Sequence, residues 1–171
     1  MTDNPSQPQE NHHFFDMPPE AFHGKIPFIV TDLIDELKRR NCEKVVGIFR
    51  LNGADTRINQ LIAELDKGRV QDWEKYTQPE DINVIACTLK RYFRKMSEKE
   101  PLATHELYTC FIAVMENIKT DPLAKATLIN LVRLLPKIRR IIMGYLCKFL
   151  YEISQHSDEN KMTPSNLSVC I

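Results

Sequence analysis

The sequence predicts an all-α protein, a single helical domain of about seven helices with no sheet. Its length of 171 residues fits one domain. Apolar residues recur at helical spacing over most of the chain, and no stretch keeps the alternation of apolar and polar residues that marks a half-buried strand. Apolar residues form 43% of the chain and charged residues 27%, a balance that supplies a buried core and excludes fully disordered classes.

The segment ahead of the first helix falls into two parts. Residues 1–13 are rich in Pro, Gln, Asn and Asp, which predicts a disordered tail. Residues 14–25 carry aromatic residues on both sides of Pro18 and Pro19, and we expect an extended segment that these rings pin to the domain. The helical domain is therefore expected over residues 14–171.

Three helices are expected in the first half of the domain. The first follows an apolar stripe over residues 30–41, and the second covers residues 58–65 and stops at Gly68, as helices often stop at a glycine. The third stripe, over residues 84–96, is the most regular, and Asp81 stands where a capping side chain is expected.

The second half predicts three further complete helices. Apolar stripes over residues 107–118, 128–135 and 138–153 define them. Pro122 is expected in the first turn of the middle helix and Pro136 at its end, because proline fits a helix start and interrupts a helix interior.

A seventh helix begins after Thr163-Pro164 and reaches Ile171 on an apolar run without a cap. We therefore expect the natural domain to continue, so that residues 14–171 lack its C-terminal part.

Charge and cysteine content narrow the function classes. Lys plus Arg and Asp plus Glu each number 23, and this zero balance argues against a dedicated nucleic-acid binder. The five cysteines never form a Cys-x-x-Cys pair and the histidines are scattered, so we expect reduced core cysteines and no metal site. The sequence has no secretory signal and no long apolar run, which predicts a soluble cytoplasmic protein without an intrinsic membrane anchor.

No motif of the sequence predicts a resident nucleotide. The five glycines build no phosphate-cradling loop, and no kinase or hydrolase signature is present. We therefore expect a protein that is not itself an enzyme and has no cofactor of its own.

The segment from Gly47 to Gly53 is the most informative part of the chain. Arg50 interrupts an apolar run there, and a permanent charge in such a setting is costly unless it reaches solvent or an anion. From this segment alone, a structural arginine that reaches solvent or a helix C-terminus is the more ordinary interpretation. The alternative is a guanidinium that the glycines present to an anionic partner.

The helix expected over residues 84–96 carries four cations, and none has an acidic residue four positions upstream. They form either a solvated face or a patch that faces an anion. The cations are Lys90, Arg91, Arg94 and Lys95.

Taken together, three ordered blocks of sequence resemble the RhoGAP (BH) domain family. The first is residues 47–53 and the second is residues 81–94. The third comprises Leu135-Pro136, Asn160-Lys161-Met162 and Asn166-Leu167-Ser168. The resemblance covers roughly residues 22–171 and implies a RhoGAP-like helical fold.

The resemblance also implies a function. A RhoGAP domain accelerates GTP hydrolysis on a Rho/Rac-type small GTPase in its GTP-bound form, and Arg50 matches the arginine finger supplied in trans. Lys90 is then expected to contact the GTPase and Arg94 to help position the finger loop. Further partner-binding positions by this resemblance are Gly47, Asn52 and Asn166. GTP and Mg²⁺ would belong to the partner, and we expect the chain to be a monomer.

Departures from the family pattern keep an alternative open. Asn83 and Phe149 stand where the family often has His, and Arg139 stands where Asn is common. The alternative is a catalytically inactive RhoGAP-like domain that binds a GTPase or another protein. Some members of the family have lost the finger, and retention of Arg50 argues against this alternative.

A third hypothesis is a helical nucleic-acid or acidic-membrane binder. It would use three basic clusters of the sequence, and the zero net charge disfavours it. The clusters are residues 38–40, 90–91 and 139–140.

Overall fold

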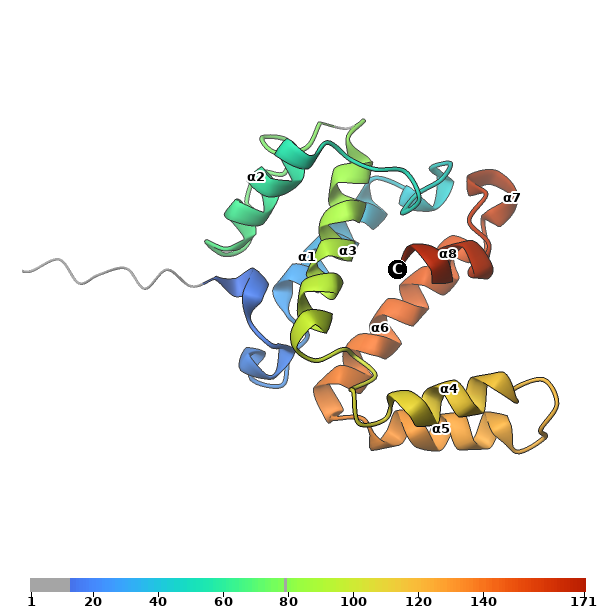
Figure 1. The fold of residues 1–171 in the computed structure, drawn as a ribbon. Helices are drawn as coiled ribbons and strands as arrows, with labels where there is room; N and C mark the ends of the chain where they lie inside the picture. The colour runs from blue at the N-terminus through green and yellow to red at the C-terminus, as the bar shows by residue number, and fades with distance from the viewer. Residues whose placement is uncertain (1–12, 79) are drawn as a thin grey trace, which may run out of the picture.

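The computed structural model describes residues 13–78 and 80–171, and within them the chain is all-helical with no strand (Figure 1). The α-helices are α1 (Phe28–Arg39), α2 (Asp55–Leu65), α3 (Ile82–Lys99), α4 (Tyr108–Glu116), α5 (Ala124–Leu134), α6 (Lys137–Ser154), α7 (Ser157–Asn160) and α8 (Pro164–Cys170). Three short 3₁₀ turns precede or join them, η1 (Phe14–Asp16), η2 (Pro19–Phe22) and η3 (Cys42–Lys44). The predicted fold class is confirmed, and the single-turn α7 is the helix that the periodicity did not reveal.

Helix α3 is the centre of the domain, with α1 and α2 packed against it (Figure 1). Its apolar stripe is buried over four turns, as the regular spacing predicts, and Ile85 is fully enclosed. Leu33 and Ile34 of α1 and Ile142 of α6 are also fully enclosed. Each such side chain stabilises the fold by roughly 1.5–3 kcal/mol through the area it removes from water.

The N-terminal segment is pinned by its aromatic residues but is not extended. Phe14–Asp16 and Pro19–Phe22 form the turns η1 and η2, the second with its proline at the first helical position. The ring of Phe15 packs edge-on against Tyr92, 5.4 Å between centroids, and its backbone N–H donates to Asp66 Oδ1 at 2.8 Å. The tail predicted for residues 1–13 lies, except for His13, outside the described residues.

Two predicted helix starts differ in detail from the structure. Asp81 occupies the N-cap position of α3, but its side chain makes no capping hydrogen bond and instead lies 2.8 Å from Nη1 of Arg57. Pro122 lies ahead of α5, which begins at Ala124, and not within its first turn. The side chain of Asp81 pairs with Arg57 instead of capping the helix, and a turn at Pro122 precedes α5. Apolar periodicity encodes neither feature.

Helices α4 and α5 form a hairpin that stands apart from the other helices (Figure 1). No residue of α4 is buried, although its sequence carries an apolar stripe, and Ile112 and Met115 are 44% and 50% exposed. The hairpin is therefore held mainly by contacts between its own two helices.

The cysteines of the chain are all free. Cys42 and Cys87 are buried as predicted, and burial raises the pKa of the Cys42 thiol to about 12. Cys110 and Cys147 are exposed, so the expectation of core positions is wrong for them. Among the described residues, no group of three or more His, Cys, Asp or Glu could hold a metal ion, and no helix is long and apolar enough to cross a membrane.

Candidate functional site

The loop between η3 and α2 carries Arg50 on a tight turn. Gly47 adopts a positive φ of 73°, and its carbonyl accepts hydrogen bonds from the N–H groups of Arg50 and Leu51, each at 2.9 Å. Ile48 and Phe49 are fully buried, whereas Arg50 is exposed. The apolar pair that precedes Arg50 is thus the anchor that directs the guanidinium-bearing residue outward. We call residues 47–51 the finger turn.

Phe49 holds the turn to two helices. Its φ of 67° is left-handed, which costs a non-glycine residue about 1 kcal/mol and requires compensating contacts. Its ring packs edge-on against Phe149 of α6 at 6.1 Å between centroids. Its carbonyl oxygen accepts a hydrogen bond of 2.6 Å from Nζ of Lys90 on α3. The Lys90 ammonium group therefore contacts the finger turn in this structure.

Gly53 presses the end of the loop against the start of α3. A Cβ atom at this position would lie 2.7 Å from the backbone N and Cα of Val84, a distance at which backbone must move. The Gly53 N–H also approaches Sγ of Cys87 at 3.4 Å. A glycine is required here because the loop and the helix backbone touch directly.

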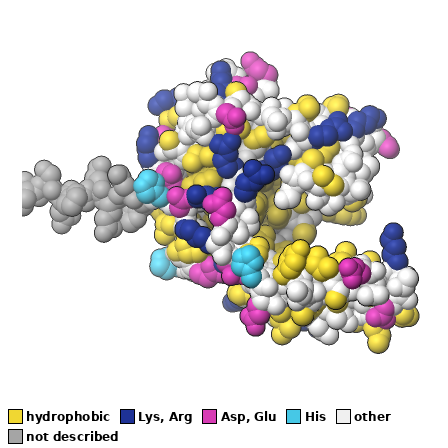
Figure 2. All heavy atoms as spheres, viewed as in Figure 1, with side chains coloured by type: hydrophobic (Ala, Val, Ile, Leu, Met, Phe, Trp, Pro, Cys, Tyr) yellow, Lys and Arg dark blue, Asp and Glu magenta, His cyan; other side chains and the backbone are white. Residues whose placement is uncertain are grey.

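An open groove of about 940 Å³ runs along α3 beside this loop. Residues of the loop and of α3 lie along it, and Figure 2 shows Lys and Arg side chains gathered above the hollow that separates the α4–α5 hairpin from the upper helices. Its lining includes Asn52, Gly53, Lys90, Arg91, Arg94 and Lys95. Arg50 itself stands outside the lining, two residues before Asn52.

The cations of this region differ in their partners. Nη2 of Arg91 lies 2.8 Å from Asp55, and Nζ of Lys95 lies 3.3 Å from Glu98. Within residues 13–78 and 80–171, the guanidinium groups of Arg50 and Arg94 make no hydrogen bond or ion pair. These two charges are therefore available to an anion on another molecule.

Comparison with known proteins decides the family. The RhoGAP domain matches residues 27–171. The chain belongs to the RhoGAP family. It is 35% identical over 146 residues to Rho GTPase-activating protein gacY of Dictyostelium discoideum, and 38% identical over 147 residues to active breakpoint cluster region-related protein of Xenopus laevis. Each match covers 85% of this chain, but the chain spans only 19% and 16% of those relatives.

Two solved structures share the fold of this RhoGAP domain. Human Rho GTPase activating protein 15 superposes with a TM-score of 0.82 at 24% identity, covering 99% of this chain and 82% of that one. The BH domain from GRAF, the GTPase regulator associated with focal adhesion kinase, gives a TM-score of 0.72 at 23% identity, covering 83% of this chain and 74% of that one.

The remaining residues singled out by the sequence are Asn52, Gly47 and Asn166. Asn52 is exposed and borders the groove, whereas Gly47 is buried within the turn. Asn166 is exposed on α8, where its N–H donates to Oγ1 of the capping Thr163 and its Nδ2 donates to the carbonyl of Lys161. Their contacts with a partner stay predictions.

The basic clusters outside the groove are paired within the RhoGAP domain. Arg39 and Arg40 both donate to the buried carboxylate of Glu36. Arg139 is buried, and its Nε donates to Oε1 of Glu20 at 2.7 Å. Arg139 also donates through Nη1 to two carbonyl oxygens of the α3–α4 loop. These charges are engaged in internal contacts, which disfavours a nucleic-acid or membrane surface at residues 38–40 and 139–140.

One buried polar residue beside the finger turn had no role assigned from the sequence. Asn160, at the end of α7, is fully enclosed, and its carbonyl oxygen accepts the Gly47 N–H at 2.8 Å. The signal for it was present in the Asn160-Lys161-Met162 block, but periodicity cannot show which distant backbone a buried amide contacts.

Proposed function

We propose that this RhoGAP domain accelerates GTP hydrolysis on a Rho-family small GTPase by supplying Arg50 in trans as an arginine finger. The observation that carries the proposal is the state of Arg50, which is exposed, follows two fully buried residues and has a guanidinium group that pairs with none of the residues that the structure describes. An arginine that served only the fold of this chain would be expected to pair within it, as Arg139 does.

The chemistry of phosphoryl transfer suits this residue. Negative charge is spread over the oxygens of the transferring phosphoryl group and the leaving group, so a planar, permanently charged donor stabilises the transition state. Such fingers contribute roughly 10³- to 10⁵-fold in rate, which is about 4–7 kcal/mol. A turn fixed by buried neighbours avoids much of the cost of ordering, at each encounter, the backbone that carries the side chain.

The groove beside the finger turn supplies a partner-binding surface in this proposal. Arg94 and Asn52 are exposed there, and Asn166 lies on the neighbouring α8. Lys90 would act from within the chain by holding the Phe49 carbonyl, in addition to any contact with the GTPase. GTP and Mg²⁺ are carried by the partner, the chain acts as a monomer, and the setting is cytoplasmic.

Single-turnover hydrolysis by a GTP-loaded Rac- or Rho-type GTPase tests the proposal. The wild-type chain at saturating concentration should raise the rate by at least about 10³-fold, and Arg50→Ala should remove nearly all of that gain. Affinity for the same GTPase loaded with a non-hydrolysable GTP analogue is measured alongside. Binding without acceleration would replace the proposal with a non-catalytic binding module, and full acceleration by Arg50→Ala would exclude the finger.

A further inference from the structure

The side chain of Asn160 is completely used inside the protein. Its Nδ2 donates to the carbonyl oxygens of Glu43, at 2.7 Å, and Ile153, at 2.9 Å. Its Oδ1 accepts from the N–H of Met162 at 2.7 Å. These three hydrogen bonds join the end of α6, the turn η3 and the α7–α8 connection at one residue of zero exposure.

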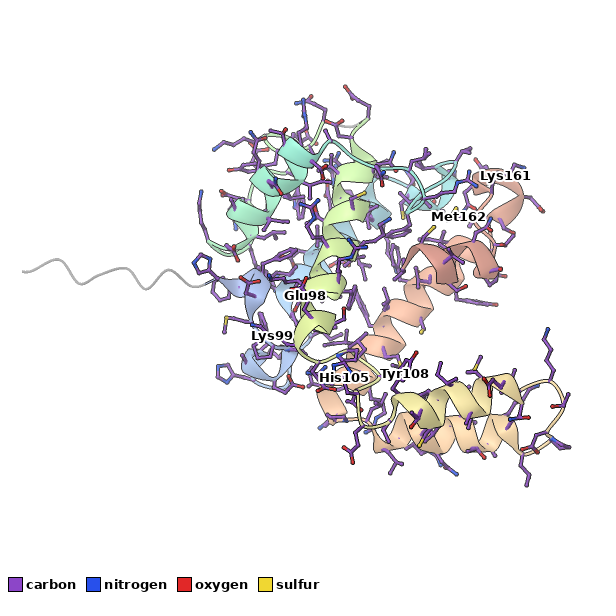
Figure 3. All side chains as sticks on the ribbon, in the orientation of Figure 1. Glu98, Lys99, His105, Tyr108, Lys161 and Met162 are labelled. Atoms are coloured by element: carbon purple, nitrogen blue, oxygen red, sulfur yellow. The ribbon has the colours of Figure 1, made fainter. Side chains whose placement is uncertain are left out.

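The backbone of Asn160 reaches the finger turn directly. Its carbonyl oxygen accepts the Gly47 N–H at 2.8 Å, and the Gly47 carbonyl in turn accepts the Arg50 N–H. Gly47 therefore makes both contacts, to Asn160 through its N–H and to Arg50 through its carbonyl oxygen. Figure 3 labels the two residues that follow Asn160, Lys161 and Met162, beside the loop that carries the finger turn.

The finger turn is thus held from two sides. On the α3 side Lys90 binds the Phe49 carbonyl, and on the α7 side Asn160 binds the Gly47 amide. Phe49 has a positive φ, which is strained for a non-glycine residue, so the turn depends on outside contacts to keep its shape. The position of Arg50 at a partner is therefore only as well ordered as the two hydrogen bonds that hold the turn.

The position demands an asparagine. Two carbonyl oxygens require a donor, and the Met162 N–H requires an acceptor, which only a side-chain amide supplies together in this geometry. An aspartate would face two carbonyl oxygens with a carboxylate oxygen, and an alanine would leave three backbone groups without partners. The hydrogen bond to Met162 also closes the turn in which Lys161 adopts a φ of 62°.

We propose that Asn160 is a positioning residue for Arg50, fixing the α7–α8 connection so that its own carbonyl holds Gly47 and the finger turn in the orientation that presents the guanidinium. This role rests on the proposed function. It predicts that a change at Asn160 lowers the rate of hydrolysis within the complex and leaves affinity for the GTP-bound partner nearly unchanged.

The test compares Asn160→Asp with Asn130→Asp, which adds the same charge on an exposed part of α5. Thermal unfolding first establishes that each variant is folded at the assay temperature. At saturating concentration, Asn160→Asp should accelerate hydrolysis about 10²-fold less than wild type, since small displacements of a reacting group cost that much. Its Kd for the analogue-loaded GTPase should change by less than about threefold, and Asn130→Asp should match wild type on both measurements.

A measurement in a second variant, which already lacks Arg50, separates a positioning role from general destabilisation. If Asn160 acts through Arg50, Asn160→Asp causes no further loss of acceleration in a chain that already carries Arg50→Ala. Amide hydrogen exchange gives a readout without any GTPase: the segment 47–51 should exchange faster in Asn160→Asp, while α3 exchanges as in wild type. Should Asn160→Asp fail to fold, Asn160→Ser, which keeps one donor and one acceptor, is taken through the same measurements.

Three results would overturn the inference: an unchanged saturating rate, an equal loss in Asn130→Asp, or unaltered exchange of residues 47–51. A wild-type chain that does not accelerate hydrolysis would sink the proposed function instead, and the exchange measurement would still decide whether Asn160 holds the finger turn.

Discussion

The α4–α5 hairpin and the helices that surround the finger turn bury their side chains to very different extents. Helix α3 alone buries ten residues, whereas α4 buries none and α5 buries only Ala124 and Leu131. The finger turn belongs to the buried region through Ile48 and Phe49. The difference teaches that Arg50 is attached to the more deeply buried of these two regions, which is the support that its proposed role toward a transition state would require. The hairpin contributes little to that support.

The largest effect should come from replacing Arg50 with lysine, compared with the same replacement in the α4–α5 hairpin. Arg50→Lys keeps the charge but loses the planar fork, and we expect it to lower the saturating rate of GTP hydrolysis by about 10³-fold. Arg133→Lys makes the same change on exposed α5 and should match wild type. Single-turnover assays on both variants check the prediction, and a fully active Arg50→Lys would show that charge alone suffices.

Truncation of apolar side chains should separate the two regions by stability. Leu33→Ala opens a cavity beside α3 and should lower the free energy of unfolding by about 3 kcal/mol, because Leu33 is fully enclosed. Ile129→Ala on α5 should change it by less than about 0.5 kcal/mol, because Ile129 is 53% exposed. Urea unfolding of the two variants measures both, and equal losses would contradict the contrast in packing.

The pH dependence of stability that Glu36 causes should likewise arise in the buried helices and not in the α4–α5 hairpin. Burial opposes ionisation of Glu36, but hydrogen bonds from Arg39 and Arg40 outweigh it and hold the pKa of this carboxyl below its ordinary value of 4.5. The unfolded chain therefore binds this proton more readily. The stability that Glu36 contributes is present above pH 4.5 and is lost as the pH falls through the lower folded pKa.

Glu36→Gln should accordingly lower the free energy of unfolding by about 2 kcal/mol at neutral pH, with the difference from wild type shrinking in acid. Glu116→Gln on exposed α4 should have no measurable effect at any pH. Unfolding curves recorded between pH 3 and 8 give the comparison, in roughly half-unit steps across the folded pKa. A constant difference down to pH 3 would argue against the ionised Glu36 as the source of stability.

The smallest predicted effect is at Gly144, which is exposed, and Gly53, which contacts the backbone of α3, provides the opposite case. Gly144 lies inside α6, and a Cβ atom added there would have no neighbour within 4 Å, so Gly144→Ala should stabilise the fold by about 1 kcal/mol. Gly53→Ala should destabilise it and slow GTP hydrolysis, because the added methyl group would meet the backbone of α3. Melting temperatures of the two variants should therefore move in opposite directions.

The sequence predicted those features that local patterns encode. The stripe of α3 gave both the helix and its buried face, and the motif around Arg50 pointed to an exposed cation between glycines. Family membership followed from three spaced blocks of residues, and the match over residues 27–171 confirms it. The roles of Arg50 and Lys90 toward a partner stay predictions. The resemblance predicts that Arg94 helps position the finger loop, but among the described residues the side chain of Lys90, and not that of Arg94, hydrogen-bonds to the finger turn.

What the sequence could not predict depends on residues far apart in the chain. The ammonium group of Lys90 finds the Phe49 carbonyl 41 residues away, and Asn160 reaches Glu43 across 117 residues. Their adjacency in the sequence places Arg139 and Arg140 in one basic cluster, yet Arg139 is buried against Glu20. Apolar periodicity also cannot distinguish a stripe that is covered from one that is left open, as on α4.

The central claim, that Arg50 meets negative charge developing on a bound nucleotide, is tested most directly with a partner held near the transition state. A Rho- or Rac-type GTPase loaded with GDP and aluminium fluoride presents such a state, and transition-state mimics bind at least about 10²-fold more tightly than ground states. The wild-type chain should bind this form about 10²-fold more tightly than Arg50→Ala does, with equal affinities for the GTP-analogue form. Equal binding of both chains to the fluoride-loaded GTPase would contradict the account.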